Sequence, residues 1–119
     1  MNVLVDTPIW IDHLRRSHAG LRWLLEDDVV LTHAFVLGEL ILGGLSDSTR
    51  ADLERLRRVE EVSHVEALHF VETNNIARSG VGWVDVHLLA ASIVGGCLLW
   101  TKDRTLADAA RSVEVAYQP

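Results

Sequence analysis

The chain alternates short apolar runs with longer segments in which apolar residues recur at helical spacing. Apolar runs of strand length lie at residues 3–5, 29–31 and 97–100, with weaker candidates at 61–64 and 113–116. The segments between them predict helices over residues 8–17, 20–26, 34–43, 47–59, 65–78, 85–95 and 104–111. This alternation is typical of an α/β domain. Because VLV and CLLW are apolar at every position, we expect a mostly parallel sheet covered by helices on both faces.

Length and composition predict one domain over residues 1–119. A chain of this length can bury one hydrophobic core, and its two prolines mark no linker. The amino terminus lacks the basic and apolar segments of a secretion signal, and no apolar run reaches membrane-spanning length. We therefore expect a cytoplasmic protein. Its single cysteine, Cys97, excludes an intrachain disulfide and a zinc framework built from cysteines.

The net charge of −6 argues against a protein that binds nucleic acid mainly through a broad basic surface. It does not exclude an enzyme that acts on nucleic acid, because a metal ion can neutralise acids gathered at one site. Four tryptophans are expected to anchor the core or an interface. Trp10 and Trp83 lie within a few residues of acids, which leaves base stacking open for them.

Four carboxylates stand where the predicted strands end or the following helices begin. Asp6 directly follows the first strand, and Asp103 follows the run CLLWT after one lysine. Glu39 lies in the second turn of the helix after the second strand, and Asp85 opens the helix VDVHLLAASIV. Because the carboxyl ends of parallel strands meet at one edge of a sheet, we expect the four acids to converge there.

Glu39 raises a separate question, because it lies in the apolar stretch HAFVLGELILGG, residues 33–44. The pattern predicts a helix that is buried on nearly every side. A buried, unpaired carboxylate costs several kcal/mol. Glu39 is therefore expected to have a counter-ion, to carry a proton or to take part in chemistry.

Each acid alone also has an ordinary structural explanation. Asp6 can begin a turn, and Asp85 and Asp103 can cap the helices that follow them. Together, however, carboxylates about 4 Å apart repel by roughly 4 kcal/mol at an effective dielectric constant near 20. Convergence thus requires a cation or a proton, and ligands that are all oxygen favour Mg²⁺ or Mn²⁺ over zinc. None of the six histidines has the spacing of a zinc motif.

With these motifs in place, the chain resembles the PIN-domain ribonucleases, and within them the VapC-type toxins of toxin-antitoxin pairs. The resemblance rests on VLVDTPIWIDHLR, on T..VLGEL..G around Glu39 and on VDVHLLAAS......LLWTKDRTL, and it spans essentially the whole chain. It assigns Asp6, Glu39, Asp85 and Asp103 to the family's catalytic, metal-binding acids. It also matches Thr101 to a supporting hydroxyl just before the last acid.

Two positions depart from the family pattern. Pro8 stands where many relatives have serine, and Thr7 is the nearest substitute for that hydroxyl. Thr105 stands where many relatives have a further acid, for which Asp108 is a candidate replacement.

The resemblance implies a three-layer α/β/α fold with a central, mostly parallel sheet of about four to five strands. It further implies a Mg²⁺- or Mn²⁺-dependent endoribonuclease that is the toxin of a type II toxin-antitoxin pair. The expected partners are the RNA substrate, a cognate antitoxin and a second copy in a homodimer, with no membrane. The apolar helices around residues 9–14 and 21–25 are candidate partner surfaces. Candidates for contacts with RNA phosphates are Lys102, Arg104, Arg15 and Arg16.

Two alternatives stay open from the sequence. Asp6 could be the phosphoacceptor of a phosphoryl-transfer or receiver-like domain, although Pro8 occupies the position of the second aspartate that a haloacid-type phosphatase needs. The chain could also be a catalytically silent PIN-like module that only binds a partner, although it has all four acids. Formation of an acyl phosphate on Asp6 from acetyl phosphate would identify the first alternative.

Overall fold

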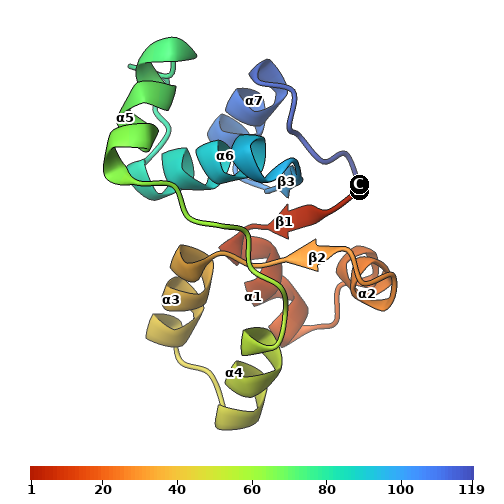
Figure 1. The fold of residues 1–119 in the computed structure, drawn as a ribbon. Coiled ribbons are helices and arrows are strands. Elements are labelled where there is room, and N and C mark those ends of the chain that lie inside the picture. Colours follow the sequence, from red (N-terminus) through yellow and green to blue (C-terminus); the bar gives the residue numbers. More distant parts are fainter.

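The computed structural model describes residues 1–119 and contains a small parallel sheet with seven helices around it (Figure 1). The strands are β1 (Val3–Val5), β2 (Val30–Leu31) and β3 (Leu98–Trp100). The helices are α1 (Thr7–Arg15), α2 (Ala19–Glu26), α3 (Ala34–Gly43), α4 (Asp47–Glu54), α5 (His64–Thr73), α6 (Trp83–Gly95) and α7 (Arg104–Ser112). No helix is both long enough and apolar enough to cross a bilayer.

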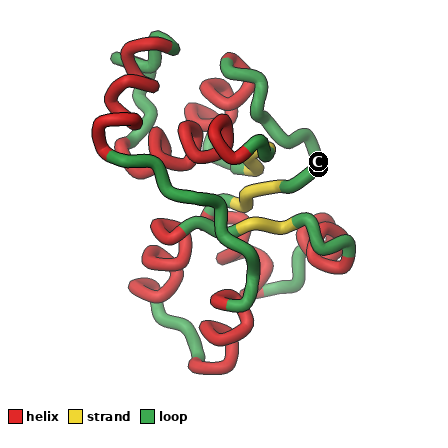
Figure 2. Tube along the Cα trace, viewed as in Figure 1, coloured by secondary structure: helices red, strands yellow, loops and turns green.

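The sheet has the strand order β2-β1-β3, with both pairings parallel. Val3 pairs with Val30 on one side and with Leu98 on the other, so β1 is the central strand. Figure 2 shows the strands in yellow between helices in red. Because all three strands run in the same direction, the segments that leave them toward α1, α3 and α7 start from the same edge.

The sheet is smaller than the sequence predicts, with three strands instead of four to five. Residues 61–64 form no strand, because α5 begins at His64 with its cap at Ser63. At that side of the sheet the chain makes one parallel bridge, between Thr32 and Arg58. At the other side, Ala116 bridges Leu99 at a single position. The strand predicted at 113–116 is thus reduced to one bridge, and the strand predicted at 61–64 is absent, since the bridge on that side lies at Arg58.

The core matches the unbroken apolar runs of the sequence. All three residues of β1 are fully buried, and α6 is buried without interruption from Val86 to Ser92. Helix α6 packs on both β3 and α5, while α1 packs on α3. Helix α6 is therefore the apolar centre of one half of the molecule, and its first turn carries Asp85.

Helix α3 differs from its prediction, since it is not buried on all sides. Val36, Leu37 and Leu40 face the core, but Glu39 is exposed and Leu42 is 90% exposed. Residues 36, 37 and 40 form one face of a helix, and apolar residues on the other face remain in solvent. The predicted burial of Glu39 is therefore wrong, and its carboxylate needs no buried counter-ion.

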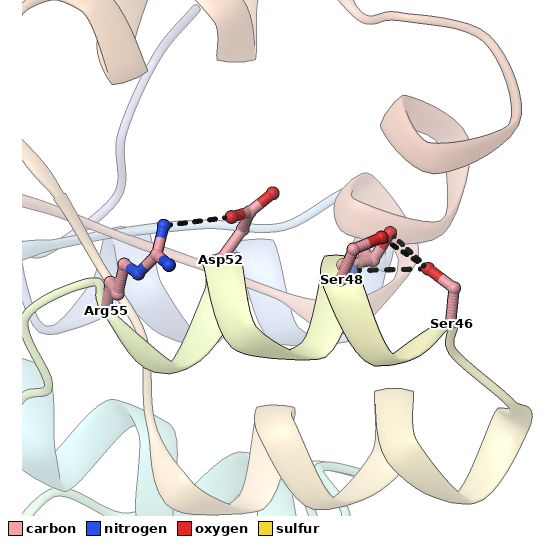
Figure 3. Close-up of polar contacts among 5 residues, drawn as sticks. Ser46, Ser48, Asp52 and Arg55 are labelled. Carbon is pink, nitrogen blue, oxygen red and sulfur yellow. Dashed lines mark hydrogen bonds and ion pairs between the residues drawn. The ribbon is translucent and has the colours of Figure 1, made fainter.

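Helix α4 is shorter than the predicted segment 47–59 and is held mainly by its own polar residues. The Ser46 hydroxyl accepts a hydrogen bond from the Thr49 amide at 3.2 Å and so caps the helix (Figure 3). The ion pair between Arg55 and Asp52, also drawn in Figure 3, is 3.3 Å long and exposed. Exposed pairs of this kind add little stability. Leu53 is the one buried residue that ties α4 to the core.

Two glycine substitutions should have opposite effects on the free energy of unfolding. A Cβ added to Gly95, at the end of α6, would lie 2.7 Å from Cγ2 of the buried Val59, whose branched side chain turns with difficulty. We expect Gly95→Ala to lower stability by about 1–2 kcal/mol. At Gly38, within α3, an added Cβ meets nothing within 4 Å, so Gly38→Ala should raise stability by about 0.5–1 kcal/mol. Urea unfolding of both variants checks this, and equal effects would contradict the packing at Val59.

Candidate active site at the carboxyl edge of the sheet

Asp6 is fixed at the end of β1 by hydrogen bonds to β3, to Thr7 and to Thr101. The residue is only 4% exposed, and its backbone amide donates to the Trp100 carbonyl of β3 at 2.9 Å. The Oδ1 atom of Asp6 accepts a hydrogen bond from the Thr7 amide at 2.8 Å, which caps α1. Its Oδ2 atom accepts one from the Thr101 hydroxyl at 2.7 Å. The Asp6 carboxylate is therefore held in one orientation.

Thr101 connects Asp6 to Asp103, as its position before the last acid suggested. While its hydroxyl donates to Asp6, the same oxygen accepts from the Asp103 amide at 3.0 Å. Asp103 is exposed and caps α7, because its Oδ1 accepts from the Leu106 amide at 3.0 Å. The helix cap explains the local position of Asp103, and it leaves Oδ2 without a hydrogen bond from the protein.

Thr7 makes the corresponding connection to Glu39. Its hydroxyl donates to Oε1 of Glu39 at 2.7 Å, which joins the first turn of α1 to α3. Pro8 fits the first turn of α1, where a missing amide proton is not needed. A chain of hydrogen bonds thus runs from Glu39 through Thr7 and Asp6 to Thr101 and Asp103.

The four acids are close enough to affect one another's protonation. Burial raises the pKa of Asp85 from 3.8 to about 6, and the charges on Asp6, Asp103 and Glu39 add to that rise. The pKa of Asp6 is also raised, first by burial, while the hydrogen bonds from Thr101 and Thr7 act against the rise and the charges of Glu39 and Asp103 support it. The negative charges of these acids therefore act on one another across α1, α3, α6 and α7.

No lysine or arginine forms an ion pair with any of the four acids. Their side chains also do not form a closed group of three or more metal ligands as they stand. The donor set nevertheless fits a hard divalent cation, because it consists of carboxylate oxygens whose negative charge the protein leaves uncompensated. An oxygen-ligated ion that keeps several waters suits such an open arrangement.

The basic candidates differ in their surroundings. Lys102 Nζ pairs with Asp12 Oδ2 at 2.6 Å, which ties the loop after β3 to α1. Arg15 lies with Glu39 in the lining of a groove of about 290 Å³ between α1 and α3. Arg104 and Arg16 are exposed and form no ion pair. Asp108 pairs with Arg111 on α7, so nothing directs it toward the four acids.

Sequence reasoning missed Asp12 at this edge and the capping role of His33. Asp12 holds Lys102, and the hydrogen bond from that ammonium group lowers the pKa of Asp12. The two residues are 90 positions apart, so no local pattern signals the pair. His33 is fully buried, and its Nδ1 accepts a hydrogen bond from the Phe35 amide at 2.9 Å, capping α3. Its position before an apolar helix was the available signal for that cap.

The raised pKa of Asp85 makes a prediction about stability in the absence of metal. Between pH 4 and 6 the folded protein keeps a proton on Asp85 that the unfolded chain releases, so stability falls as pH rises through this range. Because Asp85 is partly exposed, we discount the full shift and expect Asp85→Asn to be about 1–2 kcal/mol more stable than wild type at pH 7. The difference should vanish near pH 4. Urea unfolding in chelator checks it, and a gain that does not change with pH would contradict the assigned repulsion.

Comparison with known proteins identifies the family of the chain. The sequence model of the PIN domain matches residues 3–112. Two curated proteins, both named Ribonuclease VapC32, come from the CDC 1551/Oshkosh and H37Rv strains of Mycobacterium tuberculosis. Each is 39% identical over 117 residues, which cover 96% of this chain and 94% of the relative.

Among solved structures, PAE2754 from Pyrobaculum aerophilum superimposes with a TM-score of 0.58 and 16% sequence identity. The match covers 99% of this chain and 91% of the other. At this identity the structural match supports the fold alone, while the family follows from the sequence matches. The chain therefore belongs to the PIN-domain family, and within it to the VapC group.

Proposed function

We propose that the protein is a divalent-metal-dependent endoribonuclease and the toxin of a type II toxin-antitoxin pair. The observation that carries this proposal is the set of four acids at one edge of the sheet, which no protein cation neutralises. The names of the Mycobacterium tuberculosis relatives support ribonuclease activity and the VapC group. The cofactor that suits the donors is Mg²⁺ or Mn²⁺.

Asp6 and Asp103 are the proposed main metal ligands, with Asp85 and Glu39 binding directly or through water. A bound divalent ion lowers the pKa of a coordinated water and stabilises charge that develops on the phosphate. Thr101 and Thr7 orient the carboxylates of Asp6 and Glu39 through their hydroxyl groups. The Oε2 atom of Glu39 has no hydrogen bond from the protein, so it can accept the proton of the attacking water.

In-line attack of water on the phosphorus displaces the 3′ oxygen of the preceding nucleotide. The products are a 5′-phosphate and a 3′-hydroxyl. Lys102, Arg104 and Arg15 are the proposed contacts for the neighbouring phosphates, with Lys102 already directed by Asp12. Breaking the Lys102–Asp12 ion pair to bind a phosphate costs little free energy, because the pair is largely exposed.

The proposed protein partners are a cognate antitoxin and a second copy of the chain, acting in the cytoplasm. Exposed apolar residues on α1 and α2 support partner binding, since Ile11 and Leu14 are about 40% exposed and Trp23 is 73% exposed. Ile11 and Leu14 share a groove with Glu39, so a partner bound there would lie close to the acids.

The family of the chain argues against the phosphoacceptor alternative. The PIN-domain model matches residues 3–112, and the VapC relatives are named ribonucleases. Pro8 also stands where a haloacid-type phosphatase needs its second aspartate. Both oxygens of Asp6 accept hydrogen bonds that fix the carboxylate, and each oxygen keeps a second lone pair for a cation.

The chemistry of the product ends tests the proposed function. Wild-type protein is incubated with RNA in Mg²⁺ or Mn²⁺, and fragments are mapped by sequencing before and after phosphatase treatment. The proposal predicts internal cuts that leave 5′-phosphates. Fragments that end in 2′,3′-cyclic phosphates would require attack by the ribose hydroxyl and would contradict water as the nucleophile.

A further inference from the structure

A second groove of about 290 Å³ lies between α5, the loop before α6 and the first turns of α6. We call it the Trp83 groove. Its lining includes Leu68 and Val71 of α5, the loop residues Arg78, Ser79 and Gly80, and Trp83. None of these residues has a part in the metal chemistry proposed above. The groove therefore needs its own explanation.

Trp83 is an exposed aromatic platform with a fixed orientation. It is 42% exposed, whereas Trp10 and Trp100 are buried in the core. Its ring makes edge contacts with His64 of α5, at a centroid distance of 5.2 Å, and with His87 of α6, at 5.0 Å. Contacts from two helices hold the ring in place while a large part of it stays in solvent, as a stacking surface requires.

The groove adjoins two of the helices that carry acids of the site. Trp83 and Asp85 both lie in the first turn of α6. A Cβ at Gly80 would lie 3.6 Å from Cγ2 of Thr105, in the first turn of α7, the helix that Asp103 caps. The groove therefore borders the first turns of the helices that carry Asp85 and Asp103.

The groove also carries a free positive charge. Arg78 is exposed and forms no ion pair, and its backbone has a positive φ of 66°. In a chain with a net charge of −6, an unpaired guanidinium beside an exposed tryptophan matches a phosphate joined to a base. An uncharged peptide would offer no anion to pair with the Arg78 guanidinium.

We propose that the Trp83 groove binds one unpaired nucleotide of the RNA substrate, next to the bond that is cut. The base stacks on Trp83, and a flanking phosphate contacts Arg78. A base can stack there only when it is unstacked from its own neighbours, so the groove selects single-stranded segments or loops. This inference rests on the proposed ribonuclease function and adds to it two residues that bind the substrate, Trp83 and Arg78.

The test measures binding of a 12-nucleotide single-stranded RNA in chelator, where no cleavage is expected, by wild type, Trp83→Leu, Trp83→Phe and Arg78→Asn. Asparagine tolerates the positive φ at position 78. Val94→Ala is the control, because Val94 is exposed near the other end of α6 and does not line the groove. Circular dichroism confirms that each variant is folded.

Trp83→Leu should weaken binding by roughly five- to a hundredfold, the range for loss of one stacked base. Trp83→Phe should lose less, Arg78→Asn should reduce the salt dependence, and Val94→Ala should bind as wild type does. An oligonucleotide of equal length without bases should bind Trp83→Leu and wild type equally. Equal RNA binding by Trp83→Leu and Val94→Ala would overturn the inference.

The same assay separates this inference from the proposed function. Because binding is measured without metal, loss of affinity in Trp83→Leu would support the groove even if no RNA were cleaved. If wild type cleaves RNA in Mg²⁺ and Trp83→Leu does so with unchanged KM, the groove has no part in substrate binding and the inference falls.

Discussion

Replacing Asp6 by asparagine is expected to reduce RNA cleavage at least a hundred- to a thousandfold, roughly the loss seen when one preorganised electrostatic group is removed from an active site. Asparagine keeps the size of the side chain and one oxygen that can accept from the Thr7 amide, while its NH2 group can donate to the Thr101 hydroxyl oxygen. It removes the negative charge that the proposed cation requires. The effect should appear in kcat/KM measured at saturating Mg²⁺, with the protein still folded by circular dichroism.

Two further variants make the Asp6 result specific. Asp103→Asn should cause a loss of similar size, because Asp103 is the other proposed main ligand. Asp108→Asn is the matched control, since Asp108 is an exposed acid that pairs with Arg111 on α7. It should keep nearly full activity. If Asp6→Asn retained more than a tenth of wild-type activity, Asp6 would not be a principal metal ligand.

Removal of divalent metal is expected to abolish cleavage completely and to lower thermal stability. Without a cation, the four acids repel one another with no lysine or arginine to offset them. A bound ion stabilises the folded state by about 2.7 kcal/mol at a hundredfold excess over its Kd. Differential scanning calorimetry should therefore show a higher Tm in Mg²⁺ or Mn²⁺ than in chelator.

The control for metal removal is sodium chloride at the same ionic strength, which screens charge without binding specifically. Sodium should restore neither activity nor the higher Tm. The double variant Asp6→Asn with Asp103→Asn should lose the metal-dependent rise in Tm. Full cleavage in excess chelator would show that the reaction needs no divalent ion and would refute the proposed chemistry.

The fold was predictable largely because VLV and CLLW are apolar at every position. That pattern indicates burial on both faces, and β1 is fully buried between β2 and β3. In a parallel sheet, acids that follow the strands lie at one edge, so the sequence predicts that Asp6 and Asp103 lie near each other. The outer strands were overestimated, because a short β-rich run does not reveal whether it makes a ladder or a single bridge.

The environment of Glu39 could not be predicted from its neighbours. Residues 33–44 are so apolar that no polar face marks the exposed side of α3. Which side packs inward is decided by α1 and α4, and those contacts leave Glu39 and Leu42 in solvent. Glu39 reaches the other acids through the Thr7 hydroxyl, a contact across 32 positions that no local pattern contains.

Long-range pairs account for the other details that the sequence did not reveal. Lys102 was a candidate because of its position between Thr101 and Asp103, but its partner Asp12 lies 90 residues away. The exposure of Trp83 also depends on how α5 packs against α6. Sequence patterns give the faces of single elements, whereas these contacts depend on how several elements meet.

The most direct measurement of the central claim is a crystal of the wild-type protein soaked in Mn²⁺ and recorded at a wavelength with anomalous signal from manganese. The account predicts an anomalous peak between the carboxylates of Asp6 and Asp103, within reach of Asp85 and Glu39 directly or through water. A well-occupied manganese site elsewhere on the protein, with no peak at these acids, would contradict it.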